Sequence, residues 1–382
     1  MPQLRGAPSG YIEGRKECAS HDRPAVTAAA ETLPAVKPKR RPARQAVRAW
    51  LAIVALMIMA MVVVGGATRL THSGLSITSW QPIHGVIPPL NAGQWQEEFS
   101  AYQKIPEYQQ LNQGMTLDGF RAIYWWEYAH RLLARTIGVV VLLPLIFFWA
   151  TGRLEPALKP RVVAIFLLGA LQGAVGWWMV SSGLEVRTDV SQYRLATHLT
   201  LACIILAYTW WTVRGLSTRS IPSRASLRAV GLLIVGIALV QIFLGGIVAG
   251  LDAGMTYNTW PLMDGTIVPK GLFLMEPWWR NMFEAPATAQ FDHRMGAYTL
   301  FIVVLLHAWQ CRTYPQAATA WLLAALVTAQ AILGIATLIN MVPLHLALAH
   351  QFGAVVVLSV AVVHLRGMLP VLGEERAAAT AG

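Results

Sequence analysis

Charged residues are scarce in this sequence. Only 13% of its 382 residues are Asp, Glu, Lys or Arg, whereas 55% are hydrophobic. Soluble domains carry about 25% charged residues, because their surfaces face water. The composition therefore excludes an ordinary soluble domain and predicts an all-α polytopic membrane protein.

Cysteine is scarce as well. The chain has three cysteines, at Cys18, Cys203 and Cys311, and it contains no Cys-x-x-Cys-His motif. The missing motif excludes covalent attachment of a c-type heme. No cysteine falls in a segment that we expect on the outer side of the membrane, so no structural disulfide is expected there.

The net charge of +11 is a signal of membrane topology. Basic residues crowd directly before the first apolar run, at Lys37, Lys39, Arg40, Arg41, Arg44 and Arg48. Such clusters mark cytoplasmic flanks of membrane helices. Residues 1–47, which are also rich in Ala and Pro, are therefore predicted to form a disordered basic cytoplasmic tail and not a nucleic-acid-binding arm.

Eight apolar runs are long enough to cross about 30 Å of hydrocarbon. They are predicted near 48–68, 124–150, 161–181, 194–213, 228–249, 291–311, 319–340 and 345–367. With this assignment most Lys and Arg residues fall in the inner segments, which places both termini in the cytoplasm, with 369–382 as a second tail. In the first outer loop, 69–123, a capped amphipathic helix is predicted after Asn91, and a helix that starts at Thr116 is expected to continue into the second span.

The sequence repeats itself. Seven residues recur 180 positions later: Gly65, Gly66, Gly74, Trp80, Gly85, Ile87 and Pro89 match Gly245, Gly246, Gly254, Trp260, Gly265, Ile267 and Pro269. Because four spans is an even number, both copies cross in the same direction. We therefore predict eight transmembrane helices as two tandem four-helix bundles, 48–213 and 228–368, related by a pseudo-two-fold axis along the membrane normal.

Four histidines occupy repeat-equivalent positions near the outer ends of even-numbered spans. The motif Glu127-Tyr-Ala-His130-Arg131 is echoed by Gln290-Phe-Asp-His293-Arg294, and Arg194-Leu-Ala-Thr-His198 is echoed by Leu346-Ala-Leu-Ala-His350. A single histidine is more often a hydrogen-bonded helix contact. Four at matched depth favour axial ligation of heme iron, two in each bundle. Arg131 and Arg294 are then candidates to pair with heme propionates, or else to extend to the membrane surface.

The two copies differ at one ionisable position. Glu127 stands three residues before His130, on the same helix face, whereas Gln290 stands before His293. An amide forms hydrogen bonds but exchanges no proton near neutral pH. We therefore interpret histidine as the mark of heme and Glu127 as the mark of the half that carries out chemistry.

His307 and His364 offer a rival pattern. Each lies fourteen residues after a candidate ligand, close to a whole number of turns and about 21 Å along the same face. This spacing resembles the two-heme ladder of respiratory cytochrome b. The first bundle has Pro144 and Thr212 at these places, so the repeat does not support a ladder, and we assign both histidines to the inner membrane interface.

Taken together, these motifs closely resemble one family, the heme A synthases. The resemblance covers about 48–368 and rests on Gly65-Gly-Ala-Thr-Arg69-Leu-Thr, Asn112-Gln-Gly-Met-Thr-Leu117, Trp126-Glu-Tyr-Ala-His130-Arg131, Gly250-Leu-Asp-Ala-Gly-Met-Thr-Tyr-Asn-Thr-Trp260-Pro-Leu-Met-Asp264-Gly and Gln290-Phe-Asp-His293-Arg294. It implies oxidation of a ring methyl of heme O to the formyl group of heme A, for cytochrome oxidase. It also implies an integral protein of the bacterial inner membrane, with heme O synthase as a partner and cytochrome oxidase assembly as the recipient of the product.

The family pattern implies a role for each candidate residue. His130 and His198 would hold the substrate heme, His293 and His350 a resident heme b, and Glu127 would be the catalytic acid residue. The chain departs from many bacterial members in having no cysteine pair in 69–123, which puts any thiol relay in doubt.

Two other function classes stay open on the sequence. One is a bis-histidine b-type electron-transfer cytochrome without substrate chemistry. The other is a transporter, since many transporters are built from duplicated helix bundles. The sequence offers no pair of broken helices with facing charges to support a transporter.

Overall fold

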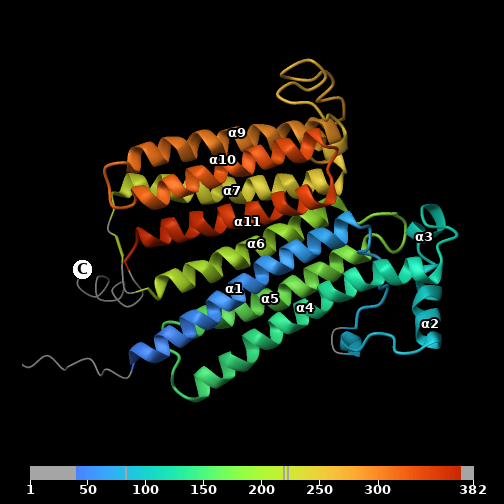
Figure 1. Cartoon of the computed structure of the whole chain (residues 1–382), viewed down its shortest axis with the longest axis horizontal. Coiled ribbons are helices and arrows are strands. Elements are labelled where there is room, and N and C mark those ends of the chain that lie inside the picture. The colour runs from blue at the N-terminus through green and yellow to red at the C-terminus, as the bar shows by residue number, and fades with distance from the viewer. Residues whose placement is uncertain (1–39, 82–83, 218–219, 222, 371–382) are drawn as a thin grey trace, which may run out of the picture. The chain divides into compact units, whose positions relative to one another are not determined.

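Each predicted apolar run lies, to within one residue, inside a long α-helix of the computed structural model (Figure 1). The structure describes residues 40–81, 84–217, 220–221 and 223–370. The long helices are α1 (Arg40–Leu70), α4 (Leu117–Ala150), α5 (Lys159–Ser181), α6 (Gln192–Gly215), α7 (Ala225–Gly250), α9 (Pro286–Cys311), α10 (Ala317–Ile339) and α11 (Leu344–Gly367). In this part of the chain the only β structure is an isolated bridge between Met263 and Thr266. The all-α prediction is confirmed.

Seven of these helices are long and apolar enough to cross a membrane, so the chain is a polytopic membrane protein. The helix outside this set is α9. Its first turns carry Gln290, Asp292, His293 and Arg294, which lower the hydropathy of a segment that is otherwise apolar.

The long helices form two rings of four within the compact unit Lys39–Gly382. In one ring α1, α4, α5 and α6 pack in this cyclic order, and in the other α9, α7, α11 and α10 do so. Consequently α4 faces α6 diagonally across the first bundle, and α9 faces α11 diagonally across the second. The bundles meet mainly where α6 packs against α7 and α11 and where α1 packs against α11 (Figure 1).

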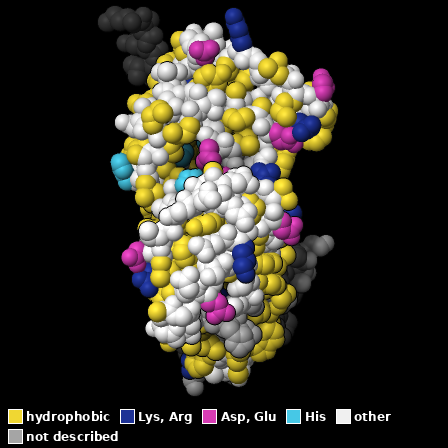
Figure 2. All heavy atoms as spheres, turned by 90° about the vertical axis from the view of Figure 1, so that its right-hand side faces the viewer, with side chains coloured by type: hydrophobic (Ala, Val, Ile, Leu, Met, Phe, Trp, Pro, Cys, Tyr) yellow, Lys and Arg dark blue, Asp and Glu magenta, His cyan; other side chains and the backbone are white. Residues whose placement is uncertain are grey.

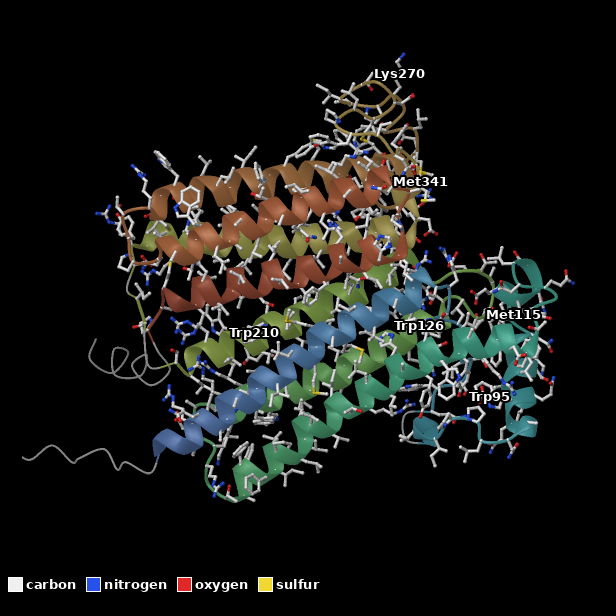
Figure 3. The ribbon with its side chains drawn as sticks, viewed as in Figure 1. Trp95, Met115, Trp126, Trp210, Lys270 and Met341 are labelled. Carbon is white, nitrogen blue, oxygen red and sulfur yellow. The ribbon has the colours of Figure 1, made fainter. Side chains whose placement is uncertain are left out.

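One end of the bundles carries the two long loops, and we call it the loop end. In the first loop, η1 (His84–Val86) precedes α2 (Ala92–Tyr102) and α3 (Pro106–Gln110). The side chain of Asn91 caps α2 by accepting from the backbone N–H of Gln94, as predicted. The second loop holds η2 (Ala253–Met255), η3 (Trp278–Arg280) and α8 (Asn281–Glu284), and its exposed tip includes Lys270 (Figure 3).

The helix α4 is long enough to project beyond a membrane. Thr116 caps its start by accepting from the N–H of Gly119, and the helix then runs unbroken for 34 residues, about 51 Å. Its first turns pack with α2 and α3 around an aromatic core that includes Trp95, Phe120 and Tyr124, and Trp95 and Met115 both lie in this module (Figure 3). The predicted continuity from Thr116 into the second span is confirmed.

One boundary differs from the prediction. The helix α1 begins at Arg40, eight residues before the predicted first span, so residues 40–47 of the predicted tail are helical. This start continues the helix through Ala43, Ala46 and Val47, which tolerate helical geometry well. The rest of the predicted N-terminal tail, and residues 371–382 of the C-terminal one, lie outside the described residues.

Candidate functional site

The four predicted histidines face across the two bundles from diagonal helices. His130 lies on α4 and His198 on α6, the two helices that face each other diagonally across the first bundle. His293 lies on α9 and His350 on α11, with ring centroids 6.5 Å apart and ring planes at 79°. His130 lies about four turns into its helix and not in the first turns, because α4 begins early, at Leu117.

The spacing of the second pair suits two ligands of one metal ion. Two imidazoles that bind a metal from opposite sides, each about 2.0 Å from it, have ring centroids about 6 Å apart. The observed 6.5 Å between His293 and His350 is close to this value. The pair thus fits the axial positions of a heme.

Each imidazole packs against a glycine of the neighbouring helix. The four glycines are Gly65 on α1, Gly176 on α5, Gly245 on α7 and Gly334 on α10. A Cβ atom at Gly334 would lie 2.7 Å from Cε1 of His350, and one at Gly176 would lie 2.9 Å from Cε1 of His198. Real Cβ atoms do not approach so closely, so a side chain at either place would displace the ring.

Three of the four rings are also held by a glutamine. The amide nitrogens of Gln172, Gln241 and Gln330 lie 3.1, 3.0 and 3.1 Å from Nδ1 of His198, His293 and His350, and each also donates to the backbone carbonyl of the same histidine. The amide oxygens are buried and have no partner among the described residues. Each glutamine thus bridges the ring and the backbone of one histidine and holds that ring in one orientation.

His130 is the exception among the four. The residue 180 positions before Gln241 is Met61, which has no amide. Among the residues that the structure describes, no side chain forms a hydrogen bond with the His130 ring. One ligand of the first bundle is therefore held less firmly than its counterpart in the second.

Glu127 is buried and fully hydrogen-bonded. Its Oε2 accepts from Ser76 Oγ and from the backbone N–H of Ile77, both at 2.8 Å. Its Oε1 accepts from Nε and Nη2 of Arg131, at 3.0 and 2.6 Å. Only 3% of Glu127 is exposed, which excludes a role as a surface anchor. The arrangement holds a carboxylate in a fixed orientation beside His130.

Gln290 takes the equivalent place in the second bundle. Glu127 contacts the backbone of Ile77, and the amide nitrogen of Gln290 donates to the carbonyl of Tyr257, 180 positions after Ile77. Within the described part of the chain, the side-chain oxygen of Gln290 has no partner. The two sites thus share the same contact between helix and loop backbone, but one presents a carboxylate and the other an amide.

The two arginines after the histidines bind the loops in the same register. Arg131 donates to the carbonyls of Ile77 and Ser79, and Arg294 donates to those of Tyr257 and Thr259. Arg131 also pairs with Glu127, whereas Nε and Nη1 of the buried Arg294 have no partner in the described ranges. Arg294 therefore keeps two donors for a carboxylate, as a heme propionate would supply.

His307 and His364 are not at an interface. They are 1% and 4% exposed, and their Nε2 atoms lie 3.0 Å apart in the core of the second bundle. The assignment to the inner membrane interface is wrong because both side chains point across the bundle and not outward. Sequence reasoning also missed Ser76, the three glutamines and the ring-packing role of the glycines, although Gly65 and Gly245 belonged to the detected repeat.

Comparison with known proteins gives a consistent result. A family model described as cytochrome oxidase assembly protein matches residues 48–362. A protein named heme A synthase from Rhizobium etli is 59% identical over 331 residues, which cover 85% of this chain and 90% of that protein. Proteins of the same name from Mesorhizobium japonicum and Brucella anthropi are 57% and 56% identical, over 85% of this chain and 91% and 92% of their own lengths.

Proposed function

Because this chain belongs to the heme A synthase family, we propose that it oxidises a ring methyl of heme O to the formyl group of heme A. Its product serves cytochrome oxidase. The observation that carries the proposal is the comparison of two matched sites, in which Glu127 supplies a carboxylate in the first bundle and Gln290 an amide in the second. It supports a chemical site in the first bundle and a resident heme in the second.

We further propose that all eight long helices span the membrane as two tandem bundles related by a pseudo-two-fold axis. The helix α9 has 26 residues, about 39 Å, which exceeds the hydrocarbon thickness. The loop carbonyls bound by Arg131 and Arg294 stand 180 positions apart, which supports the symmetry. Both termini then lie in the cytoplasm of a bacterium, with the loop end outside the inner membrane.

The candidate ligands divide between two hemes, one in each bundle. His130 and His198 bind the substrate heme, and His293 and His350 bind heme b. Two observations support heme b in the second bundle: the ring spacing of its histidines, and the N–H groups of Arg294 that lack a partner among the described residues. When bound, heme b would supply a redox centre to the protein.

The chain's own chemistry centres on Glu127. Conversion of a methyl to a formyl group removes protons as well as electrons, so a proton acceptor beside the substrate is needed. Glu127 can take a proton at Oε2 when the hydroxyl of Ser76 turns from donor to acceptor, because a hydroxyl can do both. The ion pair with Arg131 holds Oε1 in place during this exchange.

The supply of substrate points to a partner. Heme O is a hydrophobic product of another membrane enzyme, so we propose that heme O synthase delivers it to the first bundle. Figure 2 shows acidic and basic side chains scattered over the loop end, with no extended patch of one sign among the described residues. We therefore expect that a contact between the two enzymes at this end would not depend on a large patch of one charge.

The test is chromatography of hemes extracted from the purified protein and its variants. We expect heme b together with heme O or heme A in the wild type. His130→Ala should lose the substrate-type heme and keep heme b, and His293→Ala should lose heme b. If no formyl-bearing heme forms in cells that express the active protein, the alternative of a b-type electron-transfer cytochrome is correct.

A further inference from the structure

A second cluster of metal-binding side chains lies in the second bundle, at the end away from the loop end. It contains His307 and Cys311 of α9 and His364 of α11. The two Nε2 atoms lie 3.0 Å apart, Cys311 Sγ lies 3.6 Å from His307 Nε2, and the three ligand atoms lie within 4.8 Å of one another. We propose that these residues bind one d10 transition-metal ion, Zn²⁺ or Cu⁺, which ties α9 to α11.

The distances suit a compact metal centre. With metal–nitrogen bonds of about 2.0 Å and a metal–sulfur bond of about 2.3 Å, tetrahedral angles separate two nitrogens by about 3.3 Å and a nitrogen from the sulfur by about 3.5 Å. The observed 3.0 and 3.6 Å lie near these values. A small movement of the two imidazoles would admit the ion.

The same distances do not suit a second heme. Axial ligands lie on opposite sides of the iron, so their nitrogens must be about 4 Å apart. His307 and His364 are too close for this arrangement and match ligands on the same side of an ion. The cluster is therefore distinct from the heme ladder that the fourteen-residue spacing alone would favour.

Hydrogen bonds orient one of the ligands. The hydroxyl of Thr319, on α10, lies 3.0 Å from the carbonyl of Gln316 and 2.7 Å from Nδ1 of His364. When the hydroxyl donates to the carbonyl, it accepts a hydrogen bond from Nδ1. His364 then carries its proton on Nδ1 and presents an Nε2 lone pair to the cluster. A hydrogen bond from the second nitrogen to an oxygen is the usual support of a metal-ligating histidine.

Burial argues that the cluster has a ligand. His307, Cys311 and His364 are 1%, 0% and 4% exposed, and Nδ1 of His307 has no partner among the residues described. Polar groups are costly in an apolar interior unless they are paired, and apolar residues would pack there without cost. The first bundle uses Pro144, Phe148 and Thr212 at the corresponding places, so packing of a bundle does not require these groups.

The donor set selects the metal class. One sulfur and two imidazole nitrogens favour zinc or copper over magnesium, calcium or manganese, which prefer oxygen. On binding, Cys311 loses its thiol proton to solvent and supplies a thiolate, and no electron is transferred. Cys311 is the last residue of α9, so the cluster lies at that end of the bundle.

The test measures metals in the full-length protein purified in detergent from cells grown with added zinc or added copper. Elemental mass spectrometry should find stoichiometric zinc or copper besides heme iron, and the two media distinguish the metals. Cys311→Ser and His364→Ala should lose this metal. Cys203→Ser is the matched control, because Cys203 is equally buried but belongs to no metal-binding group of the described residues, and it should keep the metal.

A second measurement separates metal loss from misfolding. Thr319→Val keeps all three ligands and should weaken zinc binding about tenfold, because only the orienting hydrogen bond is lost. Heme b content should be unchanged in this variant. Protein loaded with Co²⁺ should show thiolate-to-cobalt absorption that Cys311→Ser abolishes.

Two results would overturn the proposal. One is wild-type protein that carries no zinc or copper in either medium and binds no Co²⁺. The other is metal that persists in both Cys311→Ser and His364→Ala. In either case the contact between His307 and His364 is a hydrogen bond alone, and the proposed function of the heme sites is unaffected.

Discussion

Arg131 and the buried Glu127 form an ion pair of 2.6 Å, one turn apart on α4, and both side chains also bind the backbone of the loop after α1. The carboxylate is therefore fixed by contacts from two elements. In the second bundle Gln290 and Arg294 keep the contacts with the loop but lack the ion pair.

This difference yields a paired prediction. Glu127→Gln should lower heme A output by about 100-fold or more while the protein keeps its hemes, because proton transfer is lost and the volume is unchanged. Chromatography of extracted hemes measures both quantities. The matched control is Gln290→Glu, which should leave heme A output within a few-fold of wild type. Normal heme A output from Glu127→Gln would remove Glu127 from the reaction.

Because Gly334 packs against the ring of His350, adding a single methyl group at this glycine should weaken heme binding. Gly334→Ala places Cβ 2.7 Å from the His350 ring, so the ring must move and heme b binding should weaken about tenfold. Gly236→Ala is the control in the same bundle, because no described atom lies within 4 Å of its added Cβ. Heme absorbance per chain is the measurement. Equal heme content in the two variants would contradict the proposed ring position.

The hydrogen bonds from glutamine to the candidate heme ligands lead to a prediction about how tightly each heme is bound. Gln241→Leu removes the partner of His293 and should weaken heme b binding about 10- to 100-fold, the usual cost of losing the support of a ligand. Met61→Gln introduces an amide at the equivalent place near His130. We expect slower release of the substrate-type heme in this variant, measured by heme transfer to apomyoglobin. Unchanged release would show that Met61 does not face His130.

Glu107 predicts the pH dependence of the loop-end module. Burial, and then the negative charges of Asp189 and Glu127, raise the pKa of Glu107 from 4.5 to about 8. The folded module therefore binds the proton more tightly than the unfolded chain does, and this stabilisation is complete below pH 4.5 and is lost as the pH rises through 8. The protection factors of residues 91–116 in hydrogen exchange, which exclude the intrinsic rise of exchange with pH, should fall over this window. Glu107→Gln should remove this fall, and a variant that retains it would assign the effect to another group.

Much of the arrangement could be predicted because the repeat leaves a direct trace in the sequence. The offset that aligns Gly65 with Gly245 also aligns Ile77 with Tyr257, whose carbonyls the two arginines bind. The candidate heme ligands could be chosen for the same reason. A residue pattern that occurs in both copies of the repeat can be detected by comparing the sequence with itself.

Features that belong to one copy could not be found this way. Cys311 joins His307 and His364 only because α9 and α11 face each other diagonally, and the first bundle has no such residues at the equivalent positions. The partners of Glu127 were missed for a related reason. Ser76 and the N–H of Ile77 reach it across about 50 positions of sequence, which periodicity does not reveal.

The hydrogen bonds from Arg131 and Arg294 to loop carbonyls fix the path of each outer loop near its start. Each loop is held near its start, through the carbonyls of residues 77 and 79 or of residues 257 and 259. Beyond Pro89 and Pro269, where the repeat ends, the two loops differ: one builds α2 and α3 around an aromatic core, and the other forms an extended loop with short helices. Pro89 and its counterpart Pro269 are thus the natural junctions at which to exchange loops between relatives, and we expect such an exchange to leave both candidate heme sites in place.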